Sequence, residues 1–376
     1  MDDLIEHDRP APAAEPAPAP GPLALSFTGS GAEYFRIWVV NLLLTVATLG
    51  IYSAWAKTRR LQYFYRNTHL AGASFDFLGN PKAILRGRVL AVALLTAYHY
   101  AFGFSRNTGL AIVGLLLLGL PFMMRSALRF RLSNTWYRGL PFGFAGGIKQ
   151  AYLVYLPPIA LFVVPSALLA FGLDPKTIGL FFLLYVLWPL MHGAMKRYQH
   201  RHLMYGDQVA DFPLSSGRLA LPYLHAFLLS LATIVLAIAA MAALYGFTRK
   251  GGAVGILPFM LGAGLFYLAI LLTGPYVLVR MNNRAWSATA FPGVGIDCRM
   301  RVRGYLKLQV VNVLLTVLTL GLFRPFAAVR TWRYRVEHLH VDAPEGFEQA
   351  TRSAQRRPVA AAGDGVADFL GVDLSW

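Results

Sequence analysis

Two short segments carry polar side chains inside apolar surroundings, and the spacing of these side chains places them on one helical face. The segments are "VVNLLLTVATLG" and its near copy "VVNVLLTVLTLG", and their polar residues are Asn41, Thr45, Thr48, Asn312, Thr316 and Thr319. Each set follows the spacing i, i+4, i+7, which lines up on one side of a helix. One interpretation is a polar stripe that contacts a solute or a lipid headgroup, with the two copies facing each other. The other is packing, in which these groups bond neighbouring helices or their own backbone for about 0.6 kcal/mol each.

Other reactive side chains are poorly placed for chemistry. None of the 18 Asp and Glu residues lies inside an apolar run, and coupled carriers typically place carboxylates at membrane depth. His192, His200 and His202 have no cysteine or carboxylate nearby that would complete a metal site. Nucleotide-binding and hydrolase motifs are also missing from the sequence. We therefore expect no catalytic residues, no metal, no cofactor and no enzymatic activity.

The composition indicates that lipid is the main solvent of this chain. Of its 376 residues, 56% are hydrophobic and 14% are charged, whereas a soluble protein has roughly a quarter charged residues. The net charge of +17 could indicate nucleic acid, but the basic residues lie between long uncharged runs. Contact with anionic lipid headgroups explains them better. We expect membrane lipids as partners and no nucleic acid; a homo-oligomer or a protein partner stays open.

Uncharged runs divide the chain into segments of membrane-spanning length. A spanning helix needs about 20 apolar residues, with roughly 17 as the lower limit. The six central runs are 89–105, 107–124, 150–173, 177–195, 219–248 and 251–279. The linkers on one side of these runs hold 22 Lys and Arg, against 4 on the other side. By the positive-inside rule, the rich linkers lie in the cytoplasm and the six runs form three hairpins.

The first and last runs differ from the central six because basic residues flank both of their ends. Each contains "TLG", and we expect the helix to break at Gly50 in the first copy and at Gly321 and Pro325 in the second. The interpretation we prefer is that segments 36–57 and 307–324 re-enter the membrane. The alternative is that both span it, which gives eight spans.

The basic linkers also repeat. Gly72, Gly139 and Gly206 recur every 67 residues, and Phe75 and Phe142 keep the same spacing. Alternating apolar residues beside a glycine predict a short β-hairpin in each linker. A fourth linker, "NNRAWSATAFPGVG", keeps this composition but loses the spacing. The chain is therefore pseudo-repetitive, which explains why the same apolar segment occurs twice.

Residues 27–79 ("FTGSGAEYFRIWVVNLLLTVATLGIYSAWAKTRRLQYFYRNTHLAGASFDFLG") resemble the opening of the YjgN-like bacterial inner-membrane proteins. The resemblance continues through 304–341 and covers nearly all of the chain except its two tails. It implies a multi-pass protein of the bacterial inner membrane whose biochemical role is unassigned, and it brings no catalytic residues.

The sequence thus predicts an all-α polytopic membrane protein with six transmembrane helices, two flanking apolar segments and short hairpin-like cytoplasmic linkers. Residues 1–26 are expected to form a disordered Pro/Ala-rich leader, 27–341 the membrane domain, and 342–376 a polar, disordered tail. The leading functional hypothesis is passive transport or binding of a small or lipid-like solute. The alternative is a non-transporting scaffold whose basic linkers bind anionic lipid or a protein partner.

Overall fold

The computed structural model describes residues 21–343, apart from residues 171, 173, 175, 177, 178, 180 and 182 and the segment 251–255. Most of the leader and tail expected from the sequence therefore lie outside the described residues. As predicted, most of the described chain is helical. Its α-helices are α1 (Gly31–Ala47), α2 (Ser53–Arg66), α3 (Pro81–Phe104), α4 (Arg106–Ser133), α5 (Ile148–Ala170), α7 (Trp188–Arg201), α8 (Ser216–Lys250), α9 (Ile256–Ser287), α10 (Val302–Leu318) and α11 (Arg324–Glu337).

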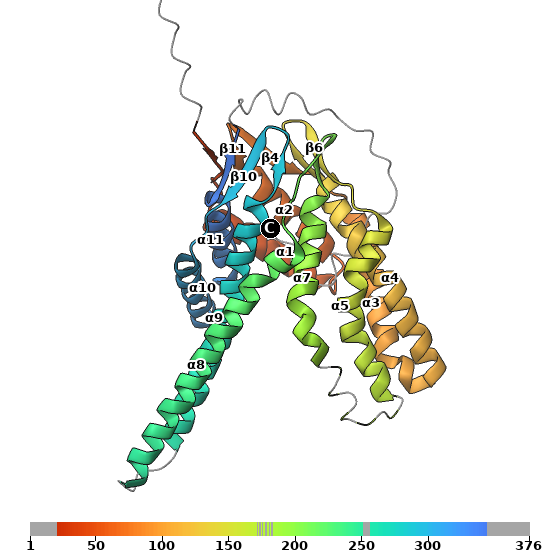
Figure 1. Cartoon of the computed structure of the whole chain (residues 1–376). Coiled ribbons are helices and arrows are strands. Elements are labelled where there is room, and N and C mark those ends of the chain that lie inside the picture. Colours follow the sequence, from red (N-terminus) through yellow and green to blue (C-terminus); the bar gives the residue numbers. More distant parts are fainter. Residues whose placement is uncertain are drawn as a thin grey trace, which may run out of the picture.

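Short strands follow each helix that returns from the apolar half of the molecule, and they gather at one end of it (Figure 1). A 3₁₀ turn at Leu184–Leu187 precedes α7. The strands are β1 (Leu23–Ala24), β2 (Ser26–Phe27), β3 (Thr68–Leu70), β4 (Ala73–Phe77), β5 (Thr135–Tyr137), β6 (Leu140–Phe144), β7 (Leu203–Tyr205), β8 (Gln208–Val209), β9 (Ala290–Phe291), β10 (Val294–Cys298) and β11 (Leu339–Asp342). The class "all-α" is therefore too narrow, because the linker strands form sheets of their own.

Tight turns explain why glycine recurs in the linkers. Gly72 and Gly139 have φ values of +76° and +78°, and the residues before them, Ala71 and Arg138, also have positive φ. Two central residues with positive φ define the type I′ turn, which matches the twist of a two-residue hairpin. The fourth linker also reverses over two residues, Pro292 and Gly293, but only the glycine has positive φ (+72°), which is the pattern of a type II turn. Its spacing differs, but its hairpin is equivalent.

The strands close into a ring. One sheet runs in the order β2-β3-β4-β5-β6-β7-β8, and the other runs β1-β11-β10-β9. The two sheets join on one side because β1 and β2 are consecutive, with the Leu25 amide donating to the Leu339 carbonyl at 3.2 Å. They join on the other side through the antiparallel bridge between Asp211 and Ala290. Closing the ring protects strand edges that would otherwise be open to pairing.

Four of the hairpins in this ring are continuous in sequence, but the fifth is assembled from both ends of the described chain. There β11 pairs with β1, with Leu23 opposite Val341 and Ala24 opposite His340. The guanidinium of Arg333 supports this junction by donating to the Gly29 carbonyl at 2.7 Å. Both ends of the described chain are thus needed to complete the ring.

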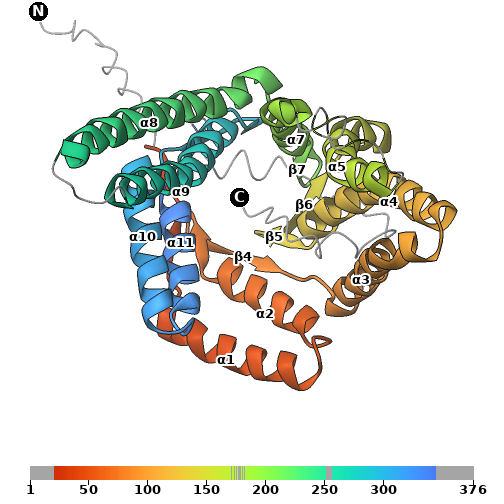
Figure 2. The same cartoon turned by 90° about the horizontal axis from the view of Figure 1, so that it is seen from below.

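Below the ring, the helices form pairs arranged in a circle (Figure 2). Within each pair the two helices pack directly against each other: α1 against α2, α3 against α4, α5 against α7, α8 against α9, and α10 against α11. In addition, α1 contacts α11. The two "VVN" segments therefore belong to neighbouring pairs of one repeating arrangement. Many leucine and valine side chains on these helices are exposed, as expected of surfaces that face lipid.

Three of the predicted spans coincide with helices that are long and apolar enough to cross a membrane. In the described part of the chain these are Arg106–Ser133, Ile148–Pro165 and Ser216–Ala243. The short outer turn expected between the first two runs is also present: α3 ends at Phe104, and the Ser105 hydroxyl caps α4 by accepting from the Thr108 amide at 3.1 Å. The remaining spans of the six to eight expected stay predictions.

Candidate functional site

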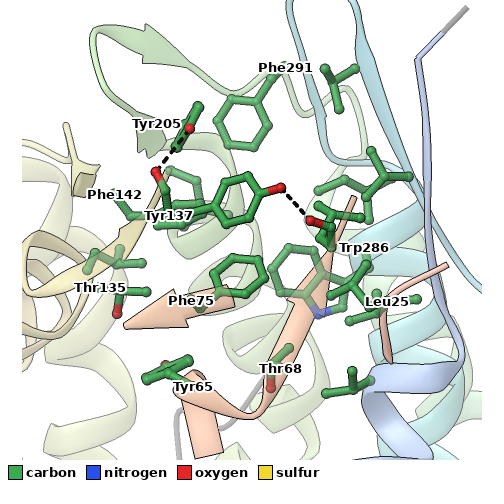
Figure 3. Close-up of a pocket in the computed structure, with 18 of the residues that line it drawn as sticks. Leu25, Tyr65, Thr68, Phe75, Thr135, Tyr137, Phe142, Tyr205, Trp286 and Phe291 are labelled. Carbon is green, nitrogen blue, oxygen red and sulfur yellow. Dashed lines mark hydrogen bonds between the residues drawn. The ribbon is translucent and has the colours of Figure 1, made fainter. Parts of the chain in front are cut away.

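A cavity of about 220 Å³ lies inside the ring of strands (Figure 3). Each of the five hairpins contributes three residues to its lining. In ring order these are Thr68, Leu70 and Phe75; Thr135, Tyr137 and Phe142; Leu203, Tyr205 and Gln208; Phe291, Val294 and Ile296; and Leu339, Val341 and Leu25. The repeating linkers thus converge on one interior.

The helices supply further lining where they enter the hairpins. Four helix residues line the cavity, and each lies three residues before the start of its hairpin at Thr68, Thr135, Thr289 or Leu339. They are Tyr65, Leu132, Trp286 and Val336. The equivalent residue of the third unit, His200, does not line the cavity. Its ring is fully buried, with Nδ1 2.9 Å from the Thr289 hydroxyl, and this burial holds its pKa well below the usual histidine value.

Aromatic rings form a continuous stack along one side of the cavity (Figure 3). Phe75 stacks on Tyr137 with ring centroids 4.6 Å apart and on Phe142 at 6.2 Å. Phe142 lies 5.2 Å from Tyr205. Since Phe75 and Phe142 occupy equivalent places in successive hairpins, the 67-residue period sets these contacts. Such ring pairs add roughly 0.5–1.5 kcal/mol each beyond their buried area.

The hydroxyl groups in this lining are used within the protein. Tyr137 donates to the Leu70 carbonyl at 2.8 Å, and Tyr205 donates to the Tyr137 carbonyl at 3.2 Å. The hydroxyls of Thr68 and Thr135 each donate to a carbonyl one helical turn back, both at 2.8 Å. Each bond links neighbouring units or closes a helix. The cavity therefore presents mainly carbon to whatever occupies it.

Burial of this lining also affects its acid–base chemistry. Desolvation raises the pKa of Tyr205 to about 12, so that its hydroxyl stays protonated and remains a donor at neutral pH. Trp332 and two polar side chains, Gln208 and Arg335, complete the lining. Arg335 donates to the Tyr305 hydroxyl at 3.1 Å. The arrangement can hold an apolar molecule.

The polar stripes predicted from the sequence lie elsewhere, in α1 and α10. The threonines bond their own helices: Thr45 to the Asn41 carbonyl and Thr316 to the Asn312 carbonyl, both at 2.6 Å. Thr48 and Thr319 also donate one turn back, and each accepts from a backbone amide beyond the helix end, at 2.9 Å. None of the six stripe residues lines the cavity.

The two asparagines are buried within their hairpins. The side-chain amide of Asn312 donates to the Thr331 hydroxyl at 3.2 Å and to the Ala327 carbonyl at 3.4 Å, both in α11. The Oδ1 atoms of Asn41 and Asn312 are buried and accept no hydrogen bond from the described residues. Asn312 thus joins α10 to α11, the packing role that the sequence left open beside the solute-contact role.

The residues expected to break the helices lie at sharp reversals. Gly50 and Gly321 have φ values of +93° and +94°, where a side chain would strain the backbone, and each follows a leucine that also has positive φ. The Gly50 amide donates to the Thr45 carbonyl at 2.8 Å, closing α1. Pro325 lies in the first turn of α11, where its fixed φ favours the start of a helix.

Sequence reasoning did not find the cavity, although its signal was in the repeats. Phe75 and Phe142 were recognised as equivalent, but their common interior depends on the closed ring.

Among the described residues, no group of three or more His, Cys, Asp or Glu could hold a metal.

The apolar helices define this chain as a helical membrane protein, and the ring of strands is a small folded region at one end of these helices. The model of a family described as bacterial protein of unknown function (DUF898) matches residues 22–369, so the chain belongs to this family. The resemblance predicted from the sequence is confirmed by two proteins named inner membrane protein YjgN. That of Salmonella typhimurium is 33% identical over 152 residues, which cover 37% of this chain and 37% of that protein. That of Escherichia coli strain K12 is 34% identical over 139 residues, which cover 35% of this chain and 34% of that protein.

The matched part therefore spans little more than a third of each relative's length. No solved structure matches the chain.

Proposed function

We propose that this protein binds an apolar, lipid-like molecule inside its ring of strands, at the cytoplasmic face of the bacterial inner membrane, without catalysing a reaction. The observation that carries the proposal is the 220 Å³ cavity, whose lining hydroxyls are bonded within the protein. An apolar cavity of about 150 Å³ stays dry and accepts small hydrocarbons. A polar solute would leave its own groups unpaired here, which is unfavourable.

The location follows from the helices and the charges. The relatives are named inner membrane proteins, and the apolar helices of this chain have the length and composition that such a location needs. Basic residues concentrate in the linkers that form the ring, and under the positive-inside rule this supports a cytoplasmic location for the ring. In this orientation the long helix pairs cross the membrane as a multi-pass bundle, and the α1–α2 and α10–α11 pairs re-enter it. Re-entry is supported by the tips of these pairs, where Leu49 and Leu320 are each 95% exposed.

The proposal can be tested by photochemical labelling in membranes. A phospholipid with a diazirine in its acyl chain is incorporated into membranes that contain the full-length protein, and the labelled peptides are mapped by mass spectrometry after irradiation. We expect label in the strand segments 68–77, 135–144 and 290–296 in addition to the lipid-facing helices. The helices serve as an internal control, because any bilayer protein is labelled there.

A matched pair of variants separates binding in the cavity from contact with the outside of the ring. Val294→Trp fills the cavity, whereas Val209→Trp adds the same bulk to a strand residue that is 44% exposed and does not line it. The strand label is expected to disappear in Val294→Trp and to persist in Val209→Trp. If wild-type strands carry no label while the helices do, the ring is a solid scaffold and the binding proposal is wrong.

A further inference from the structure

A second hollow lies outside the ring, where α8 and α9 approach the strands. It is a groove of about 500 Å³ lined by His225 and Leu229 of α8 and by Tyr276, Arg280 and Arg284 of α9. The three α9 residues follow the spacing i, i+4, i+8 and therefore share one face of the helix. From these residues we propose that the groove binds the phosphate group of an anionic membrane lipid.

The groove holds its guanidinium groups ready for an anion. Arg284 donates to the Arg218 carbonyl at 3.1 Å, which orients its side chain across the groove. Arg280 lies over the Tyr276 ring with its guanidinium carbon 5.8 Å from the centroid. In the described part of the chain neither arginine forms an ion pair with a carboxylate, unlike Arg66, which pairs with Asp76 at 2.8 Å. Two such guanidiniums on one helix face fit the oxygens of a phosphate.

The surroundings select a lipid over a soluble phosphate. On the side away from the ring, α8 exposes a run of apolar side chains, among them Phe227, Leu228 and Leu231. Leu229 lies in the groove itself and is 56% exposed. On the ring side, α8 begins at Ser216 and α9 ends at Ser287. The basic residues therefore lie at the boundary between the apolar part of the helices and the ring of strands. A lipid places its phosphate at this level, and its acyl chains continue along the helices.

This inference uses the membrane orientation proposed above, but it does not depend on what occupies the cavity. The test is a titration of the delipidated full-length protein in detergent with phosphatidylglycerol, in which native mass spectrometry measures the bound fraction. Phosphatidylcholine, which carries a phosphate without net negative charge, is titrated in parallel. We expect Arg280→Gln to weaken phosphatidylglycerol binding about tenfold, as expected for one lost hydrogen bond to a charged group. Arg280→Lys keeps the charge and should recover part of this loss.

A matched control removes the same charge elsewhere. Lys82 and Arg86 are exposed and lie one turn apart at the end of α3 that is next to the ring of strands, as Arg280 and Arg284 do in α9. The double variant Arg280→Gln/Arg284→Gln should lose binding, and Lys82→Gln/Arg86→Gln should keep it. Equal losses in the two double variants would mean general surface attraction and would overturn the site.

Further outcomes distinguish a lipid phosphate from a soluble phosphate, and the groove proposal from the cavity proposal. Displacement of the lipid by millimolar inorganic phosphate would assign the groove to soluble phosphates and overturn the lipid assignment. Binding of phosphatidylglycerol that is unchanged in Arg280→Gln/Arg284→Gln would also overturn it. Val294→Trp should leave the part of this binding that depends on Arg280 and Arg284 unchanged, so that failure of the groove and failure of the cavity give different results.

Discussion

The long and the short helix pairs occupy equivalent places below one ring, yet they differ in how far they extend from it. In the α3–α4 pair the helices have 24 and 28 residues, whereas α1 and α10 have 17 each and α2 and α11 have 14 each. At 1.5 Å per residue, a 17-residue helix is about 25 Å long, shorter than the hydrocarbon core of about 30 Å. Equivalent positions in the ring therefore do not impose one helix length; the point of reversal sets it.

The two kinds of pair also reverse by different chemistry. Between α3 and α4 the reversal takes the single extended residue Ser105, whose hydroxyl caps the next helix. Between α10 and α11 the chain passes through Leu320 and Gly321, both with positive φ, and the Gly321 amide donates to the Thr316 carbonyl at 2.7 Å. The short pairs thus carry their own stop signal, which the α3–α4 pair lacks.

The largest expected contrast between the two kinds of pair is in their access to water. Single cysteines are placed at Leu320 and at Asn107 in a Cys298→Ser background. A membrane-impermeant thiol reagent added from the periplasmic side should label position 107, which lies beside the outer turn, and leave position 320 unlabelled. In the wild-type protein, which serves as the unlabelled control, burial raises the pKa of Cys298 to about 11, so that little reactive thiolate forms at neutral pH.

Periplasmic labelling of position 320 would mean that the short pair crosses the membrane, and the distinction between long and short pairs would fail. A second tip position, Leu49→Cys, repeats the measurement in the other copy. If positions 49 and 320 differed from each other, the two copies could not share one topology.

A smaller effect is expected from the stop signal itself. Gly321→Ala adds a side chain at φ +94° and should destabilise the protein by about 1–2 kcal/mol. Gly103→Ala in α3 meets open space in a helical conformation and should be neutral or stabilising by up to about 1 kcal/mol. The shift in the thermal unfolding midpoint in detergent compares the two variants. Because Gly321 also has open space around it, a loss there reports backbone strain alone.

The sequence contains enough information to predict the repeats, the turn glycines and the break in each short pair, because these features depend on local spacing. It does not reveal the closed ring, since strand pairs such as Phe75 with Tyr137 and Leu23 with Val341 join residues that are far apart in the sequence. The cavity is missed for the same reason. Alternation shows that Phe75 and Phe142 share one face of their strands, but only closure of the ring makes that face an interior.

The fourth linker was recognised by its composition, but its lost spacing has a different cause. It follows α9, and α8 and α9 have 35 and 32 residues, so that Gly293 falls outside the 67-residue period. A search that allowed the helix pairs to vary in length would find it through "FPG", where Pro292 and Gly293 supply the turn. In the stripes of α1 and α10 the periodicity is clear from the sequence, but it does not show which partners the side chains use. In the structure their threonines donate to the backbone of their own helices.

The smallest change in stability is expected for the buried Asn312 of the α10–α11 pair. Asn312→Leu keeps similar bulk and removes a buried Oδ1 that accepts no hydrogen bond from the described residues, at the expense of the contacts with Thr331 and Ala327. Polar contacts between membrane helices contribute about 0.6 kcal/mol on average, so the change in stability should stay below about 1 kcal/mol. Strand labelling by the diazirine lipid should also be unchanged. A variant that kept its unfolding midpoint but lost this labelling would mean that Asn312 lies on the route to the ring, and the short pairs would then act in binding as well as in packing.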